Sequence, residues 1–275
     1  MADVSDGAPP PDLLSSKQVA AFVAHGFVRL DEVVPANLCA AALAEIAAGA
    51  LQATALPGQP LDDAWARSPA LGPILRLPAV AGAIESLVGP RARYDHHHAH
   101  VVPPRQLWSQ PWHTDAILDP RPFAFDIQLF FFFHDTPREA GGTMILPGSH
   151  FRRVNESDVG RYQNFRGQIA TVCRAGTLVC CHHGLWHCGQ PNHTHAPRTL
   201  LKVRVAPSGR QLRPWDLRDI DDPAIADTLR FTHPWTGGDA RLEIVQRIKL
   251  WRHLTGNATF DVDHWLTRIE EPQGA

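Results

Sequence analysis

Short runs of β-prone residues, each ended by a turn signal, fill the middle of this 275-residue chain. Pro-Gly, Gly-Gly and Pro-Asn steps separate the runs, and residues of this kind favour turns over continued strands. Many short strands in one block predict an all-β sandwich or barrel. The expected strands cover residues 93–102, 123–134, 143–146, 168–172, 177–181 and 199–205.

The run at 123–134 is apolar at almost every position, which indicates a central strand between two packed layers. Successive side chains of a strand point to opposite faces. The face that is wholly apolar is expected to pack against helices, and the mixed face is expected to look into the barrel. The first face carries Phe125, Ile127, Leu129 and Phe131, and the second carries Asp126, Gln128, Phe130 and Phe132.

Helices are expected on both sides of the β block. Ser15 or Ser16 can cap a first helix that ends at Gly26, before a short strand at 27–30, and Pro35 opens a second helix. Residues 55–72 are expected to be rich in loops, and 73–88, 223–229, 242–254 and 261–271 to be helical. We predict a disordered segment at 1–12 and a single domain at 13–275, with a helical part (13–90), a β core (91–207) and a helical extension (208–275).

The composition is that of a globular enzyme or binding protein. Hydrophobic residues make up 44% and charged residues 20%, and the net charge of -2 predicts no nucleic-acid partner. The N-terminus lacks the features of a signal peptide, and no apolar window is long enough to span a membrane. The five cysteines include no CxxC pair, which is typical of free thiols. We therefore expect a cytoplasmic protein without a membrane partner, and the oligomeric state stays open.

A candidate metal site lies at Trp112-His-Thr-Asp115. In an extended segment residues i and i+2 point the same way, so the side chains of His113 and Asp115 can reach one metal ion. With a second histidine they would form the facial triad of non-haem iron(II) oxygenases, which leaves coordination positions open. On its own the motif also fits a polar strand end.

Further motifs follow in a fixed order. They are Gly142-Thr-Met-Ile-Leu-Pro-Gly-Ser-His150, then Gly176-Thr-Leu-Val, then Trp186-His187-Cys-Gly-Gln-Pro-Asn192. Over residues 13–206 the chain resembles the phytanoyl-CoA dioxygenase family of Fe(II)/2-oxoglutarate oxygenases. The resemblance implies a double-stranded β-helix, the cupin-like jelly-roll. It also implies that His113, Asp115 and His187 hold Fe(II).

The resemblance implies a co-substrate site as well. Turn-rich residues after His187 would return the chain so that Arg198 lies beside the metal, where family members bind the distal carboxylate of 2-oxoglutarate. The family also places Phe130 at the co-substrate, and His98 is the candidate on the strand at 93–102. Gln128 shares the face of Phe130 and either donates to the co-substrate or is a core polar residue.

Candidate substrate contacts are less specific. Lys202 and Arg204 lie an even number of residues after Arg198, so on a strand all three side chains point to the same face. Lys202 and Arg204 therefore either neutralise an anionic substrate or line the barrel. Trp112 either excludes water from the site or packs in the core. A charged segment at 151–167 is either a lid or a surface loop.

The remaining histidines allow several interpretations. Alternation places His96, His98 and His100 on one face of their strand and His97 on the other. The three histidines that share a face either form a second metal site or are polar side chains that face the active-site cavity. The other histidines near the expected third ligand are interpreted as surface or second-shell groups (His182 and His183) and as solvated groups (His193 and His195).

The resemblance implies a dioxygenase that uses Fe(II), 2-oxoglutarate and dioxygen, with ascorbate as a supporting reductant, and that releases succinate and CO2. Asp115 stands where halogenating relatives have a small residue, so hydroxylation of a C–H bond is expected, although desaturation and ring formation share the signature. The small-molecule substrate, an acyl-CoA, an osmolyte or a secondary metabolite, stays open. The alternatives are a cupin-type isomerase or hydrolase, which would not depend on Arg198, and a non-catalytic metal-binding sensor.

Overall fold

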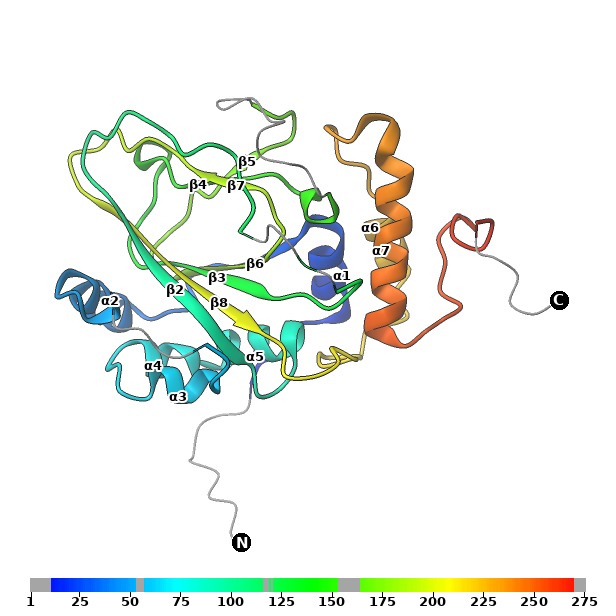
Figure 1. Ribbon diagram of the computed structural model, residues 1–275, viewed down its shortest axis with the longest axis horizontal. Coiled ribbons are helices and arrows are strands. Elements are labelled where there is room, and N and C mark those ends of the chain that lie inside the picture. The colour runs from blue at the N-terminus through cyan, green and yellow to red at the C-terminus, as the bar shows by residue number, and fades with distance from the viewer. Residues whose placement is uncertain (1–10, 53–56, 116–118, 120, 153–163, 270–275) are drawn as a thin grey trace, which may run out of the picture.

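The computed structural model describes residues 11–52, 57–115, 119, 121–152 and 164–269. Two antiparallel sheets face each other (Figure 1). The larger has the strand order β1 (Phe27–Leu30), β6 (Thr177–His182), β3 (Ile127–Phe132), β8 (Arg198–Ala206), β2 (Arg93–Val102). The smaller has the order β5 (Ile169–Ala170), β4 (Thr143–Ile145), β7 (His187–Gly189). This arrangement confirms the predicted jelly-roll core.

Two details of the sheets differ from the expectation. The larger sheet takes in β1, which lies outside the predicted core of 91–207 and pairs with β6 in the register Val28↔Cys180. β7 was not expected to be a strand. It is short, and its pairing with β4 joins residues that are far apart in the sequence.

The central strand β3 divides the core into two parts. All six of its residues are buried. The outward side chains Ile127, Leu129 and Phe131 join the large hydrophobic cluster that includes the helices. The inward side chains Phe130 and Phe132 join a separate cluster between the sheets. The predicted alternation of faces is therefore confirmed.

Helices cover the outer side of the large sheet, opposite the small sheet (Figure 1). A capping box at Ser15 begins α1, and Gly26 ends that helix in the left-handed conformation. The predicted helix at 73–88 is two helices, because Pro78 has no N–H to donate and starts a new helix after Leu77. Residues 55–72, which were expected to be rich in loops, also contain the short helix α3 and the start of α4. The helices of this part are α1 (Ser16–His25), α2 (Ala36–Ala47), α3 (Leu61–Trp65), α4 (Leu71–Leu75) and α5 (Pro78–Val88), with a 3₁₀ turn at Ala50–Gln52.

The C-terminal part packs beside α1 (Figure 1). It contains α6 (Ala224–Leu229) and α7 (Ala240–Thr255), and 3₁₀ turns lie at Arg138–Ala140, Ser149–Phe151 and Gly237–Asp239. The prediction of a helix at 261–271 is wrong for its described part, where residues 261–269 form bends and turns. The Asp261 carboxylate accepts the backbone N–H groups of Leu266 and Thr267, which folds the chain back on itself.

A buried polar cluster joins α7 to α1. Arg247 is 1% exposed, and its Nη2 donates to Nδ1 of His233 over 2.8 Å. Because a guanidinium only donates, His233 is protonated on Nε2, which lies 3.1 Å from Nδ1 of His25. Burial and the charge of Arg247 lower the pKa of His233 to about 3 and that of His25 to about 4.

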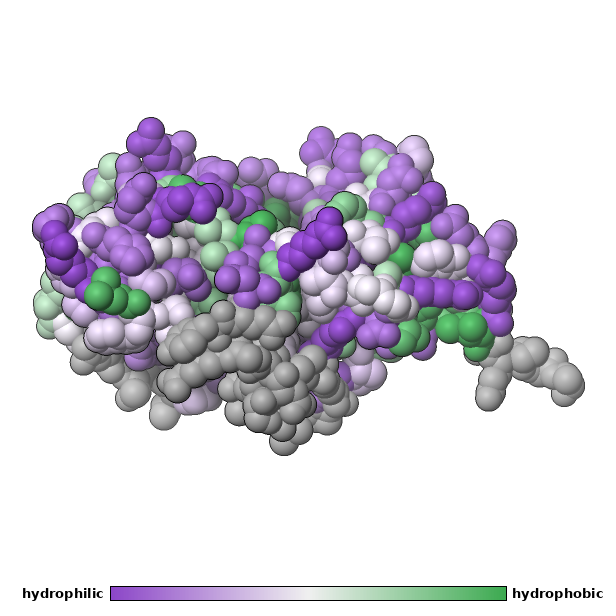
Figure 2. Space-filling view, turned by 90° about the horizontal axis from the view of Figure 1, so that it is seen from above, coloured by the Kyte–Doolittle hydropathy of each residue, from purple (hydrophilic) through white to green (hydrophobic). Residues whose placement is uncertain are grey.

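Within the described part of the chain, no helix is both long and apolar enough to cross a bilayer. The face in Figure 2 is mostly hydrophilic, with hydrophobic residues in small separate groups. The predicted disorder at 1–12 falls largely on residues outside the described ones, as does most of the 151–167 segment.

The central strand provides a test of the core. Leu129 is fully buried, whereas Leu242 is 63% exposed. Leu129→Ala is expected to lower the free energy of unfolding by about 2–5 kcal/mol, because it leaves a cavity between β3 and the helices. Urea denaturation should show little change for the matched variant Leu242→Ala. Equal effects of the two variants would contradict the placement of β3 at the centre.

The buried pair His25 and His233 predicts that the stability of the fold depends on pH. Both folded-state pKa values lie below the ordinary value of 6.5, so the unfolded chain binds more protons between pH 6.5 and about 4. The free energy of unfolding should therefore fall as the pH drops through this window. His233→Gln keeps an acceptor for Arg247 and a donor for His25 but does not titrate. Urea titrations should show a shallower pH slope for this variant, and an unchanged slope would contradict the assignment.

Candidate metal centre

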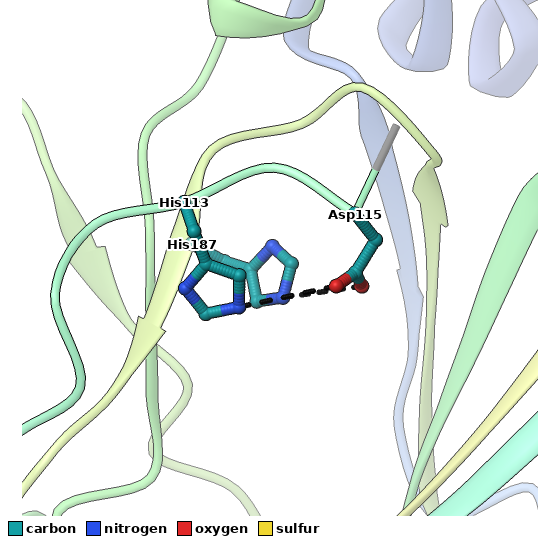
Figure 3. Close-up of side chains that lie close together, drawn as sticks. All are labelled: His113, Asp115 and His187. Atoms are coloured by element: carbon teal, nitrogen blue, oxygen red, sulfur yellow. Dashed lines mark ion pairs between the residues drawn. The ribbon is translucent and has the colours of Figure 1, made fainter. Parts of the chain in front are cut away.

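Backbone pairing brings the two histidines of the site together. His113 and His187 form an antiparallel bridge, with the His113 N–H donating to the His187 carbonyl over 3.1 Å and the reverse bond at 3.0 Å. Asp115 lies two residues beyond His113, and its carboxylate points at both rings (Figure 3). The candidate ligand atoms of the three residues all lie within 4.8 Å of one another.

Hydrogen bonds fix both histidines in one tautomer. Nδ1 of His113 lies 2.9 Å from the Pro111 carbonyl, and Nδ1 of His187 lies 3.0 Å from the Leu185 carbonyl. A carbonyl only accepts, so each Nδ1 carries a proton and each Nε2 is the ring nitrogen left to bind a metal. The Asp115 oxygens lie 3.9 Å from Nε2 of His113 and 3.6 Å from Nε2 of His187. This donor set fits a divalent cation of the iron type.

The charge states also suit metal binding. Burial lowers the pKa of His187 to about 4, so its ring is neutral near neutral pH. Burial opposes ionisation of Asp115. His187, which is protonated at the low pH where Asp115 titrates, and Lys202 outweigh this effect and hold the pKa of Asp115 below its usual value. The site therefore offers a neutral imidazole at His187 and a carboxylate at Asp115.

A cavity opens beside the triad, between the two sheets. His113 and His187 line it together with Phe130, whose ring lies 5.4 Å from that of His187, and with Arg198 and Lys202. The cavity is also lined by residues that the sequence interpretation did not assign to the co-substrate site, namely His100, Val102, Gln106, Gln110, Thr143, Gly189, Gln190 and Leu200. Of these, His100 lies on the same face of its strand as His96 and His98, so its position could be inferred from the alternation. Gln106 and Gln110 lie on a loop, and no sequence pattern predicts their position.

Arg198 provides a buried cation at this cavity. It begins β8, is 5% exposed, and donates through Nη1 to the carbonyls of Ala140 at 2.7 Å and Gln190 at 2.9 Å. These bonds hold the guanidinium in place without neutralising it. No described carboxylate pairs with it, and burial alone lowers the pKa of Arg198 to about 10. A buried charge of this kind favours an anionic ligand.

Two co-substrate candidates do not line the cavity. His98 is exposed and pairs in register with Lys202, whereas the neighbouring inward residue His100 pairs with Leu200 and does line it. Burial lowers the pKa of His100 to about 3, so this ring is neutral. Gln128 is 1% exposed, and its Nε2 donates to the His183 carbonyl at 3.4 Å, which places it in the polar core.

The candidate substrate contacts also have protein partners. Nζ of Lys202 lies 2.7 Å from Oδ2 of Asp115. Arg204 pairs with Asp126 at 2.7 Å and with Asp95 at 3.1 Å, and it does not line the cavity. The charges of both cations are thus balanced by carboxylates of the chain. Trp112 is 4% exposed and packs in an apolar cluster with Leu146, Trp186 and Cys188.

The remaining histidines do not form a second metal site. Among the described residues, His113, Asp115 and His187 are the only group of at least three side chains that could hold a metal. His97 points away from the cavity and lies 2.7 Å from the Tyr94 hydroxyl. His183 is not a surface group, since it is 3% exposed and its Nε2 lies 2.8 Å from Asp119. His193 and His195 are exposed, as expected.

Comparisons with known proteins identify the family of the chain. The family model described as phytanoyl-CoA dioxygenase (PhyH) matches residues 22–200, so the chain belongs to the phytanoyl-CoA dioxygenase family. No curated protein sequence matches the chain.

Solved structures share the fold at low sequence identity. The non-heme alpha ketoglutarate dependent carbocyclase SnoK from nogalamycin biosynthesis has a TM-score of 0.57 and 21% identity, over 77% of this chain and 92% of that one. The epimerase SnoN, in complex with Fe3+, alpha ketoglutarate and nogalamycin RO, has a TM-score of 0.54 and 18% identity, over 70% and 83%. EctD from S. alaskensis has a TM-score of 0.53 and 20% identity, over 75% and 80%.

The metal ligands are open to a direct test. His187→Ala removes one of the two nitrogen donors, whereas His193→Ala changes an exposed ring in the following loop. Loss of a residue that only orients a metal ligand lowers metal affinity by about 10- to 100-fold. Isothermal titration should show a larger loss of Mn(II) affinity for His187→Ala, because this variant removes a ligand itself. His193→Ala should bind like the wild type. Normal Mn(II) affinity in His187→Ala would rule out the assigned triad.

Proposed function

We propose that the protein is an Fe(II)- and 2-oxoglutarate-dependent dioxygenase that hydroxylates an unactivated C–H bond of a small molecule and releases succinate and CO2. Membership of the phytanoyl-CoA dioxygenase family supports this proposal. The observation that carries it is that the buried guanidinium of Arg198 shares a cavity with His113 and His187 of the metal-ligand triad. A metal site alone would serve many reactions, but a fixed, unneutralised cation beside it suits a dianionic co-substrate.

Each side chain has a separate task in this proposal. His113, Asp115 and His187 would hold Fe(II), which supplies the oxidising chemistry when dioxygen and 2-oxoglutarate bind. Arg198 would bind the distal carboxylate of 2-oxoglutarate with the guanidinium N–H groups that do not bond to Ala140 and Gln190. Phe130 forms an apolar wall next to His187 and limits the water that reaches the site.

The reaction outcome and the substrate depend on residues farther from the metal. Among the structural neighbours are a carbocyclase and an epimerase, so the same core supports more than hydroxylation in other proteins. Hydroxylation is our proposal because the carboxylate of Asp115 takes up a ligand position at the triad. An acyl-CoA, an osmolyte and a secondary metabolite remain the substrate classes to be screened.

All five cysteines are free, as the sequence predicted. A cytoplasmic location of the protein stays a prediction.

The reaction class is tested by turnover without a substrate. Incubation with Fe(II), ascorbate and 2-oxoglutarate in air is expected to give slow release of succinate. The anaerobic mixture is expected to show a metal-to-ligand absorption band. A protein that gives neither the band nor succinate, with any substrate from the three classes, is not a 2-oxoglutarate oxygenase. A cupin-type isomerase or hydrolase, or a metal sensor, would then be the better account.

Arg198 gives a sharper test of the co-substrate site. Arg198→Met is expected to weaken 2-oxoglutarate binding by about 10- to 100-fold, because it removes charge-assisted hydrogen bonds of about 1.5–3 kcal/mol. Mn(II) affinity should change little, since Arg198 touches no metal ligand. Arg174→Met removes an arginine with a 74% exposed side chain and is the matched control. Anaerobic titration of the Fe(II) absorption band measures the 2-oxoglutarate affinity, and calorimetry measures the Mn(II) affinity. Equal 2-oxoglutarate affinity in the two variants would contradict the proposed clamp.

A further inference from the structure

Lys202 makes an ion pair with the carboxylate of the metal site. It lies on β8 with its side chain toward the barrel interior, between Phe130 of β3 and His98 of β2 in the strand register. The side chain is 10% exposed, and Nζ lies 2.7 Å from Oδ2 of Asp115. The ammonium is therefore held against a candidate metal ligand and not against solvent.

The two carboxylate oxygens of Asp115 have different hydrogen-bond partners. Oδ2 accepts the hydrogen bond from Lys202, whereas no described side chain donates to Oδ1, which lies 3.9 Å from Nε2 of His113. A carboxylate can bind a cation through one oxygen or through both. Binding through both would use one more coordination position of the metal. A hydrogen bond that engages Oδ2 disfavours that mode and leaves Oδ1 available.

We propose that Lys202 is a positioning residue that restricts Asp115 to binding the metal through one oxygen and so keeps a coordination position open for 2-oxoglutarate. This inference rests on the proposed function. It assigns Lys202 to the metal centre and not to recognition of an anionic substrate, because its charge is already paired with Asp115. Partners of this kind orient metal ligands in other metal sites.

The charge balance points the same way. With Lys202 present, the carboxylate of Asp115 is neutralised within the protein, so a bound divalent cation keeps its charge for the dianionic co-substrate. Without Lys202, the buried carboxylate has lost its partner, which is costly. The metal then becomes its main counter-charge. Removing Lys202 should therefore leave metal binding as tight or tighter, while 2-oxoglutarate binding weakens.

Arg204 is a matched control on the same strand. It lies two residues after Lys202 with the same inward parity, and its side chain is 16% exposed. Its partners, Asp126 at 2.7 Å and Asp95 at 3.1 Å, are not ligands of the triad. Arg204→Met thus removes a buried cation and an ion pair from β8 without touching Asp115. A general effect of lost charge or of a weakened strand would affect both variants.

The experiment uses Mn(II) as the metal probe on the full chain, with Lys202→Met, Lys202→Arg and Arg204→Met. Water-proton relaxation reports the number of exchangeable waters on bound Mn(II), and titration calorimetry gives the affinities for Mn(II) and then for 2-oxoglutarate. For Lys202→Met we expect one fewer water, unchanged or tighter Mn(II) binding, and 2-oxoglutarate binding weakened by about 10-fold or more. Lys202→Arg, which keeps a charged donor, should restore the water count. Arg204→Met should match the wild type in all readouts.

Two results would overturn the inference. Parallel loss of Mn(II) and 2-oxoglutarate affinity in Lys202→Met, shared by Arg204→Met, would show a merely structural role. A wild-type water count and 2-oxoglutarate affinity in Lys202→Met would show that the ammonium leaves Asp115 when the metal binds. If the wild-type protein binds Mn(II) but not 2-oxoglutarate, the proposed function fails, and the water count still decides the role of Lys202.

Discussion

The pair of backbone hydrogen bonds between His113 and His187 is the contact on which the site depends. It joins the loop before β3 to the start of β7, and these two segments are far apart in the sequence. Once these residues lie opposite each other, the carbonyls of Pro111 and Leu185 fix both ring tautomers. Asp115 then follows at the spacing that directs its carboxylate to the same point. The jelly-roll matters for function mainly because it holds this bridge in place.

Much of the fold could be predicted from local patterns. Alternation along 123–134 predicted the two faces of β3, and turn residues marked most strands. Where the pattern failed, the cause was a backbone or tertiary effect. Pro78 divides the predicted helix at 73–88, the carboxylate of Asp261 organises turns in place of a C-terminal helix, and β7 exists only through its pairing with β4. None of these effects changes hydrophobic periodicity, which is the signal that sequence patterns use.

The site was predictable to the extent that its chemistry is local or resembles a family motif. The His113–Asp115 spacing is local, and the positions of His187 and Arg198 came from the resemblance. Cross-strand register is not visible in one sequence, so His98 was chosen although His100 reaches the cavity. The same limit applies to charge. Lys202 was visible as a cation, but its partner Asp115 is 87 residues away and could not be assigned without the fold.

The central claim is that one cavity holds Fe(II) at the triad and 2-oxoglutarate between the metal and Arg198. Anomalous diffraction from a crystal grown anaerobically with Fe(II) and 2-oxoglutarate tests it most directly. The account predicts an iron peak within bonding distance of Nε2 of His113, an oxygen of Asp115 and Nε2 of His187, with the distal carboxylate of 2-oxoglutarate on the guanidinium of Arg198. An iron peak elsewhere, or 2-oxoglutarate bound away from Arg198, would contradict it.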